Sequence, residues 1–429
     1  MKKILLLILA AAVCGAPILS AAEVLPQIAI QNLRSKAMGG ARLAILDDQY
    51  AMMNNPAGPS VLRYKNGEHS YRNRWLSLIQ AQGVIAGDFL SFWENKDALI
   101  EAAGSIADGV TLENDLYNYL SGLRLAAGTT PLFFSMQNIL PLHLSLAVFD
   151  SLNMRVKTNP DGPLPTWDIL AYNDTVAVLN FAYKLPEIEL GVFKERGNIL
   201  ELSFGANAKV IQRMQIGKNG AEISDLVDLS DLNMKKLDFR RGMAFGMDLG
   251  IVAAFHLNVD GADWYTQKRD KPDLTLSLVC TDFYKTRFSW TRPNSYDSLG
   301  DILFGDGESI DGPAGEGVIK PGLGIGVAWW IGTIIPFVLD DIILTFDVRD
   351  IFSSASTTFL KIYAGFEFSV IKAFKLRGGI YQGYLSGGLG IDVPVLPIEI
   401  DFAYWGEEMG LYPGQERLDN FGATLNLVF

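Results

Sequence analysis

The sequence predicts an all-β protein: a transmembrane antiparallel β-barrel of about 14 strands, with an N-terminal plug and a helical hairpin insertion. Three observations lead to this prediction. The C-terminal half alternates apolar and polar residues with period two, and the chain ends on Phe429 with no polar tail. The alternating segments run about 9–11 residues, which is the span that a tilted transmembrane strand needs, whereas strands of soluble sheets average about 5–6 residues.

The first 22 residues have the features of a secretory signal peptide. Two lysines form a basic start, Ile4–Val13 is an apolar stretch, and small residues precede a cleavage site after Ala22. This pattern is an export signal and not part of the fold. A rival interpretation makes Cys14 a lipoprotein anchor, but lipoprotein processing prefers a small residue in the place of Val13. We therefore expect cleavage near Ala22.

Composition excludes several classes of protein. The 429 residues are 49% hydrophobic, which is too apolar for intrinsic disorder. A formal charge of −12 argues against binding to nucleic acid. Two Cys and three His leave no basis for a disulfide scaffold or a metal centre. The loop Gly305–Gly317 misses the spacing of a calcium loop, and His143 and Ser145 have no orienting third group. We predict no enzyme, no cofactor and no metal.

Period-two alternation defines the predicted strands. In Gly322–Leu339 the glycines alternate with branched apolar residues, which indicates a barrel strand with a tight inner wall. The stretch is nearly long enough for a membrane helix, but Pro336 would interrupt one. The predicted strands cover residues 70–81, 129–139, 143–156, 175–183, 200–211, 243–255, 273–280, 322–339, 342–349, 359–370, 372–380, 385–393, 397–405 and 420–429. Such barrels have an even number of strands.

The two faces of these strands predict different surroundings. The polar faces carry charges of both signs close together, which can pair across a barrel lumen: Lys361, Glu367, Arg377, Glu399, Asp401 and Arg349. Aromatic residues near strand ends fit the girdles at the membrane interfaces: Trp329, Trp330, Tyr381, Tyr384, Tyr404 and Trp405.

Residues 94–125 do not follow the strand pattern. Leu99, Ile100, Ala103 and Ile106 recur at helical spacing, and Thr111 can cap a second helix. We expect a helical hairpin inserted in the barrel. It is a lid over the pore, a plug, an adhesion surface, or a loop insertion without ligand contact.

Residues 23–60 precede the first strand and form the second irregular segment. Gly39 and Gly40 permit tight backbone geometry, Asp47 or Asp48 can cap a short helix, and Asn55-Pro56 is a turn signal. We therefore divide the chain into a signal peptide (1–22), an N-terminal plug (23–60) and a barrel (61–429).

This N-terminal pattern resembles a known family. Gly39, Gly40 and Ala41, then a short helix with an aspartate, then Asn55, Pro56, Ala57 and Gly58, are similar to the N-terminal hatch of FadL-type outer-membrane transporters. The resemblance implies a 14-stranded barrel whose hatch plugs the lumen and gates the uptake of hydrophobic small molecules such as long-chain fatty acids. It also implies location in the bacterial outer membrane. A terminal aromatic such as Phe429 is what the barrel assembly machinery of that membrane recognises.

The expected partners are a hydrophobic small molecule, the lipids of the outer membrane and the barrel assembly machinery. Arg349 and Arg377, if they face the lumen, can pair with a ligand carboxylate or with Glu367, Glu399 or Asp347 across the lumen. Other functions stay open: a barrel that binds proteins or assists secretion, a general porin, and a soluble periplasmic β-protein.

Overall fold

The computed structural model describes residues 32–48, 50–61, 76–86, 124–139, 142–159, 166–186, 188–189, 199–221, 239–256, 272–296, 299–310, 318–332, 340–353, 357–371, 373–392, 398–408, 414 and 417–428. The expected signal peptide and Phe429 lie outside these ranges, as does nearly all of the expected helical hairpin. None of the helices in the described ranges combines the length and the apolar character that a bilayer-spanning helix requires.

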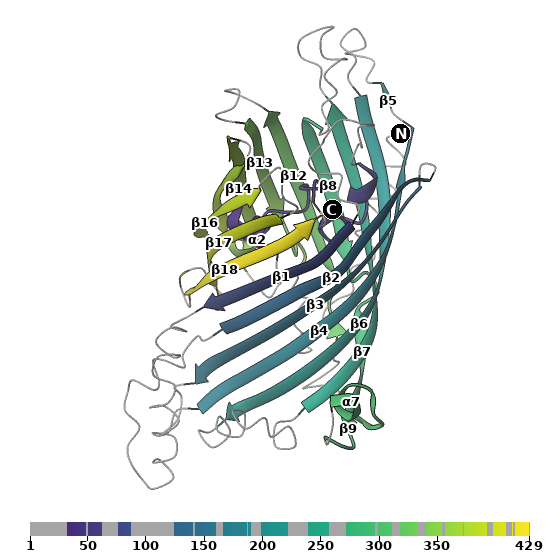
Figure 1. Cartoon of the computed structure of the whole chain (residues 1–429), viewed down its shortest axis with the longest axis vertical. Helices are drawn as coiled ribbons and strands as arrows, with labels where there is room; N and C mark the ends of the chain where they lie inside the picture. Colours follow the sequence, from purple (N-terminus) through teal and green to yellow (C-terminus); the bar gives the residue numbers. More distant parts are fainter. Residues whose placement is uncertain are drawn as a thin grey trace.

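The described strands form one antiparallel sheet that closes into a barrel (Figure 1). They are β1 (Leu76–Ala86), β2 (Arg124–Ile139), β3 (Leu142–Asn159), β4 (Thr166–Lys184), β5 (Ile188–Glu189), β6 (Ile199–Ala221), β7 (Phe239–His256), β8 (Leu274–Thr281), β9 (Thr286–Pro293), β10 (Gly307–Ile310), β11 (Val318–Ile319), β12 (Gly322–Gly332), β13 (Asp340–Val348), β14 (Ile362–Val370), β15 (Phe374–Tyr381), β16 (Tyr384–Asp392), β17 (Ile398–Glu408) and β18 (Arg417–Val428). The helical turns are α2 (Leu33–Ala37), α3 (Ala51–Asn54), η1 (Gly58–Ser60), α7 (Leu299–Phe304) and η4 (Thr358–Lys361).

These segments amount to the 14 barrel strands that the sequence predicts. β5 continues β4 along β6, and both β8 and β9 run along β7. β10 and β11 pair with β9, and β12 pairs with β8. β8 and β9 therefore share one strand position, and β10, β11 and β12 share the next. β1 closes the ring because it pairs with β18 on one side and with β2 on the other.

The break between β8 and β9 changes the phase of the alternation. Residues 282–285 separate the two segments, and Asp282 and Lys285 both adopt positive φ, 51° and 57°. Odd-numbered residues such as Val279 are buried before the break, and even-numbered residues such as Phe288 are buried after it. The inner face is thus preserved through an irregular turn.

The predicted alternation holds along the wall. In β12 the inner residues Gly324 and Gly326 are buried, while Ile325 and Trp329 on the outer face are 48% and 54% exposed. The tight inner wall predicted for this strand is therefore confirmed. Outward leucine, isoleucine and phenylalanine side chains recur on strands around the barrel, as a lipid-facing surface requires.

Four details of the prediction are wrong. No strand was predicted at residues 286–293, which form β9. The strand predicted to begin at Phe359 begins at Ile362, because residues 358–361 form η4. β2 begins at Arg124, so the expected insertion ends before residue 125. Trp330, Tyr381 and Trp405 are 6%, 7% and 0% exposed and pack in the interior instead of in an outer girdle. Strand parity, which reverses with every residue, decides which aromatic faces lipid.

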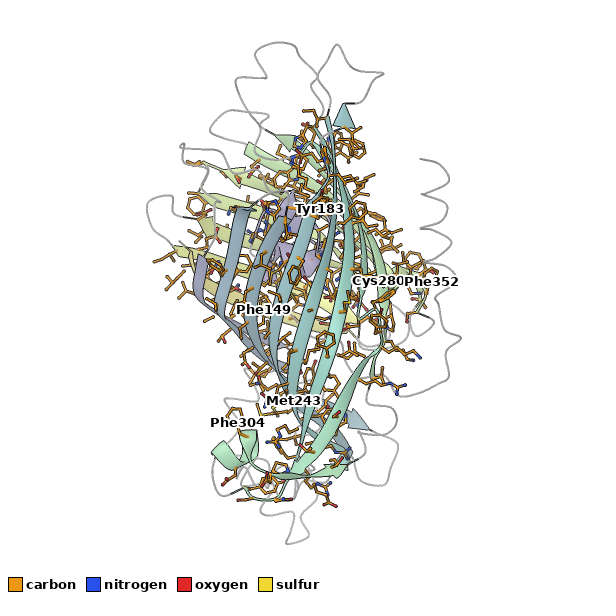
Figure 2. The ribbon with its side chains drawn as sticks, turned by 90° about the vertical axis from the view of Figure 1, so that its right-hand side faces the viewer. Phe149, Tyr183, Met243, Cys280, Phe304 and Phe352 are labelled. Carbon is orange, nitrogen blue, oxygen red and sulfur yellow. The ribbon has the colours of Figure 1, made fainter. Side chains whose placement is uncertain are left out.

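The barrel wall has two unequal halves. β3, β4, β6 and β7 contain 18, 19, 23 and 18 residues, far more than the predicted span, whereas β13–β16 contain 8 or 9. The long strands make one side of the barrel much taller than the other (Figure 1). Tyr183 lies in the upper part of this long wall and Met243 in its lower part (Figure 2).

Candidate functional site

Residues 32–61, which we call the hatch segment, lie inside the ring of strands (Figure 1). The described chain has four buried apolar clusters, and each combines hatch residues with wall residues. The α2 turn is capped by Asn32, whose side chain accepts a hydrogen bond from the Ser35 amide at 3.0 Å. The core of the molecule is thus the contact between hatch segment and wall.

In the Gly39-Gly40 motif, Gly39 fits against backbone of β14 and β15, and Gly40 fits against the rings of Tyr363 and Tyr381. Gly39 and Gly40 adopt φ of 67° and 79°, a region that glycine enters without strain. A Cβ on Gly39 would lie 2.0 Å from the Ala364 carbonyl oxygen, and one on Gly365 would lie 2.1 Å from the Met38 carbonyl oxygen. Side chains at these positions would therefore push the hatch segment away from the wall.

The Asn55-Pro56-Ala57 motif fits a second glycine patch on the opposite part of the wall. Gly205 on β6 and Gly250 on β7 are direct cross-strand neighbours. A Cβ on Gly205 would lie 2.1 Å from the Pro56 carbonyl oxygen, and one on Gly250 would lie 2.0 Å from Asn55 Oδ1. The paired glycines leave room for main chain to contact main chain.

Hydrogen bonds fix this second contact. Asn55 Nδ2 donates to Ser277 Oγ at 2.6 Å and to the Ile251 carbonyl at 3.0 Å. Asn180 Nδ2 donates to the Pro56 carbonyl at 2.8 Å. Asn207 on β6 donates to the Met52 carbonyl at 2.9 Å. The motif is therefore bonded to β4, β7 and β8, and the preceding Met52 is bonded to β6.

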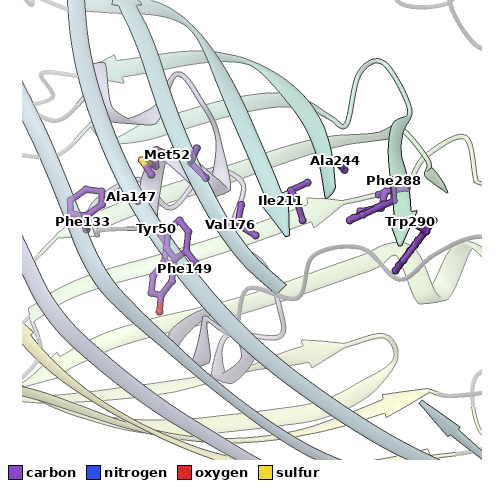
Figure 3. Close-up of a cluster of buried hydrophobic side chains, with 12 residues drawn as sticks. Tyr50, Met52, Phe133, Ala147, Phe149, Val176, Ile211, Ala244, Phe288 and Trp290 are labelled. Carbon is purple, nitrogen blue, oxygen red and sulfur yellow. The ribbon is translucent and has the colours of Figure 1, made fainter. Parts of the chain in front are cut away.

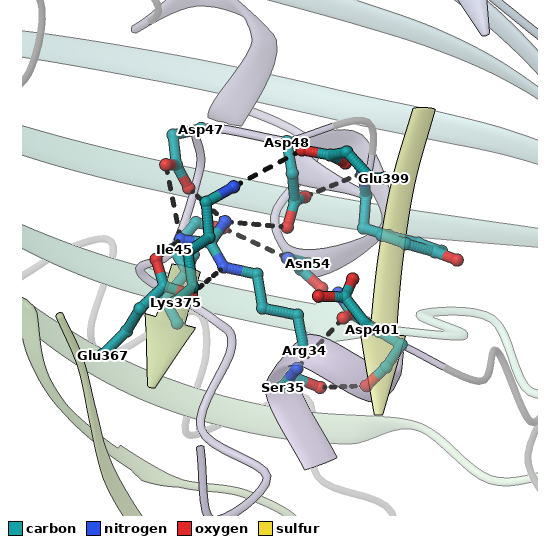
Figure 4. Close-up of polar contacts among 12 residues, drawn as sticks. Arg34, Ser35, Ile45, Asp47, Asp48, Asn54, Glu367, Lys375, Glu399 and Asp401 are labelled. Carbon is teal, nitrogen blue, oxygen red and sulfur yellow. Dashed lines mark hydrogen bonds and ion pairs between the residues drawn. The ribbon is translucent and has the colours of Figure 1, made fainter. Parts of the chain in front are cut away.

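A buried ionic network joins α2 to the short half of the wall (Figure 4). Arg34 donates from Nε and Nη2 to the two carboxylate oxygens of Glu367 at 2.8 and 2.7 Å, and from Nη1 to Asp47 at 2.6 Å. Arg377 Nε also donates to Glu367, at 2.6 Å, and its Nη1 donates to Asp401. Burial opposes the charge on Arg34, but the three carboxylates around it hold its pKa well above the usual value.

A polar cavity opens beside this network. It is small, about 40 Å³, and it is lined chiefly by charged and amide side chains: Arg34, Asp47, Asp48, Lys375, Arg377, Glu399, Asp401, Asn32, Gln80 and Asn426. No group of three or more His, Cys, Asp or Glu residues in the described ranges is arranged to hold a metal ion. An apolar molecule finds no complementary surface in this cavity.

The long half of the wall presents an apolar inner belt (Figure 3). Cross-strand partners carry this belt over five strands in one continuous row: Phe149, Val176, Ile211, Ala244 and Phe288. Phe133, Val178 and Trp290 extend it, and Tyr50 and Met52 of the hatch segment pack in the same cluster. Phe288 and Trp290 are stacked with ring centroids 5.3 Å apart. We call these residues the apolar belt.

The two arginines singled out from the sequence occupy different surroundings. Arg377 is bonded to Glu367 and Asp401, which is one of the two alternatives expected for it. Arg349 donates to the Gly40 carbonyl at 3.0 Å, and its guanidinium carbon lies 3.5 Å from the centroid of the Tyr363 ring. Both arginines contact the hatch segment or its ionic network, and a ligand carboxylate would have to compete with Glu367 and Asp401 for Arg377.

Sequence reasoning missed Arg34 as the centre of the network and missed the apolar belt. Arg34 precedes the recognisable motif, and only its charge in an otherwise apolar segment could have drawn notice. Four residues of the belt row lie within predicted strands, but Phe288 lies on β9, where no strand was predicted, and the continuity of the row depends on register.

Solved structures of outer-membrane barrels resemble this chain. They include the Pseudomonas putida toluene transporter TodX (11% identity, TM-score 0.45, 93% of this chain and 98% of that one), the monoaromatic hydrocarbon channel CymD (12%, 0.45, 92% and 97%) and the Ralstonia pickettii toluene transporter TbuX (12%, 0.44, 92% and 98%). These are FadL-type channels, the kind that the N-terminal motif resembles. At such low identity the likeness concerns the course of the chain and leaves the substrate open.

No family model matches the chain. No curated protein matches it either.

Proposed function

We propose that this protein is an outer-membrane channel for the uptake of hydrophobic small molecules, such as long-chain fatty acids, with the hatch segment as its gate. It reaches the bacterial outer membrane after cleavage near Ala22, and the barrel assembly machinery inserts it through the C-terminal strand that ends in Phe429. Its outer face contacts the lipids of that membrane.

The observation that supports this proposal is the apolar belt inside the barrel. A general porin has a polar lumen, whereas here one inner half-wall presents phenylalanine, tryptophan and branched side chains beside the hatch segment. Burying apolar ligand surface there contributes about 25 cal/mol per Å². The belt is therefore the part of the molecule that suits an apolar cargo.

The two inner surfaces suggest a sequence of steps. A ligand partitions onto the apolar belt, where Tyr50 and Met52 close the end of the cluster. The cavity near Arg34, which Tyr50 also lines, is mostly charged and offers an apolar ligand little stabilisation. Passage therefore requires the hatch segment to shift, and its many hydrogen bonds to β4, β6, β7 and β8 keep the resting channel closed.

The test compares Phe149→Ala in the belt with Phe366→Ala, which removes an equal side chain from the outer face, where Phe366 is 41% exposed. Initial uptake of radiolabelled toluene and of laurate is measured in cells that lack other channels. We expect F149A to lose about 0.7–1.4 kcal/mol of ligand-binding free energy, which lowers its uptake roughly three- to tenfold. F366A should match the wild type.

Heat-modifiable gel mobility shows whether each variant is folded. Equal uptake by folded F149A and wild type would contradict the proposal. The two probes separate cargo classes: laurate carries a carboxylate and toluene has no polar group. If cells with the protein take up neither probe faster than cells without it, a role in protein binding or secretion is favoured.

A further inference from the structure

Three cations gather where the hatch segment meets the short half of the wall, away from the apolar belt. Lys36 Nζ lies 2.6 Å from the Tyr381 hydroxyl and 4.3 Å from the centroid of that ring. Arg349 stacks on Tyr363 and donates to the Gly40 carbonyl. The Tyr363 and Tyr381 rings meet edge to face, with centroids 5.4 Å apart. Arg42 completes the group from the hatch side.

The position of Arg42 is fixed through its main chain and not through its guanidinium. Asp347 Oδ2 accepts the Arg42 amide at 2.6 Å and the Leu43 amide at 2.9 Å. In the part of the chain that the structure describes, buried Nε atoms of Arg42 and Arg349 both lack a hydrogen-bond acceptor. Asp347 is also the carboxylate whose charge acts on both guanidiniums.

The cluster has more positive than negative charge. Arg42 and Arg349 both interact with the carboxylate of Asp347, and Arg349 also interacts with Asp350, while Lys36 beside Tyr381 adds a third positive charge. Burial together with the neighbouring Arg349 lowers the pKa of Arg42 to about 10. Two neighbouring guanidiniums whose Nε donors lack an acceptor are a donor set that a planar or tetrahedral oxyanion satisfies.

We propose that Arg42 and Arg349, supported by Lys36, form a binding site for an oxyanion, a carboxylate or a phosphate group, at the seam between hatch segment and wall. Arg42 belongs to the hatch segment and Arg349 follows β13 in the wall. An anion held by both residues therefore ties the hatch segment to the barrel and slows its release. This role does not depend on the identity of the transported molecule.

The test measures hydrogen–deuterium exchange of peptides within residues 40–61 in the full-length, detergent-solubilised protein. Sodium phosphate and sodium acetate are compared with sodium chloride at equal ionic strength. Phosphate, acetate or both should slow exchange about three- to tenfold in the wild type, and the more effective salt identifies the preferred anion. Arg42→Gln should abolish this slowing of exchange. Arg42→Lys keeps the positive charge but loses the paired N–H donors of the guanidinium, so it should retain part of the slowing.

Arg417→Gln is the matched control, because Arg417 is an exposed arginine that pairs with Asp419 at 2.7 Å. Heat-modifiable gel mobility confirms that each variant is folded. An R42Q protein that responds like the wild type would overturn the proposal. Equal protection by chloride, or no protection by any salt, would overturn it as well.

Discussion

At the scale of single residues, Asn55 explains why the hatch motif contains an asparagine. Its Oδ1 accepts the Ala57 amide at 2.9 Å, which closes a turn around Pro56. Its Nδ2 donates to Ser277 and Ile251 on the wall. Aspartate cannot donate and alanine can do neither, so one amide side chain both shapes the turn and attaches it.

Asp48 makes hatch stability depend on pH. Burial, reinforced by Asp47 and opposed by Arg34, raises the pKa of Asp48 from 3.8 to about 6. The folded state therefore binds this proton more tightly than the unfolded state. Protonated Asp48 therefore contributes at most about 3 kcal/mol to the free energy of unfolding. This contribution is fully present below about pH 4 and is lost as the pH rises through about 6.

We predict that exchange of the peptide containing Asp48, corrected for intrinsic rates, is at least about fivefold slower at pH 4.5 than at pH 7.5. Asp48→Asn, which imitates the protonated side chain, should be slow at both pH values. The attribution to Asp48 fails if D48N keeps the pH dependence of the wild type.

At the scale of elements, the glycines of the wall form docking patches for the hatch segment. Gly205 pairs with Gly250, and Gly365 pairs with Gly379, so each patch spans two strands. Each faces one of the two glycine- or proline-containing motifs of the hatch segment. Strand glycine normally costs stability, and here close backbone contact between the two parts of the chain offsets that cost.

This contact predicts that Gly205→Ala dislodges the hatch segment at the Pro56 end. The new Cβ would lie 2.1 Å from the Pro56 carbonyl oxygen, so the main chain must move. Gly83→Ala is the matched control, because a Cβ there meets nothing within 4 Å. In planar bilayers we expect G205A to show at least a severalfold higher mean conductance than the wild type. Equal conductance of G205A and G83A would show that the contact does not close the pore.

At the scale of the whole molecule, the proposed location in the outer membrane implies that the long wall extends beyond the bilayer. The 23 residues of β6 are more than twice the 9–11 that cross a bilayer. On the outer face of β4, Leu179 and Phe181 are exposed and apolar, whereas Thr175 bonds to Asp150 at 2.8 Å. We place the membrane boundary of this wall between Leu179 and Thr175.

That boundary predicts different costs for one charge at two sites on β4. Leu179→Arg should lower the free energy of unfolding by about 2–4 kcal/mol, and Thr175→Arg by no more than about 1 kcal/mol. Unfolding in urea from lipid vesicles measures both values. Similar losses at the two sites would mean that the hydrocarbon layer reaches past Thr175.

Much of the barrel could be predicted because a period-two pattern is a local property. Alternation in β12 or β18 is visible without knowing any partner strand, and the 14 strand positions follow from repeating that observation. The lengths of β3 to β7 could not be predicted in the same way. In β3, for example, the inner residues change from apolar Phe149 to polar Ser151 and Asn153, so the apolar pattern of the inner face is lost before the strand ends.

The sequence by itself determined the barrel, its strand count and the segment that carries the hatch motif, because each is written in neighbouring residues. Only the tertiary structure decided what that segment contacts. Arg34 and Glu367 are separated by 333 positions yet share two hydrogen bonds, and the apolar belt exists only when five strands align in register. Contacts of that kind depend on how the sheet closes, which no local pattern records.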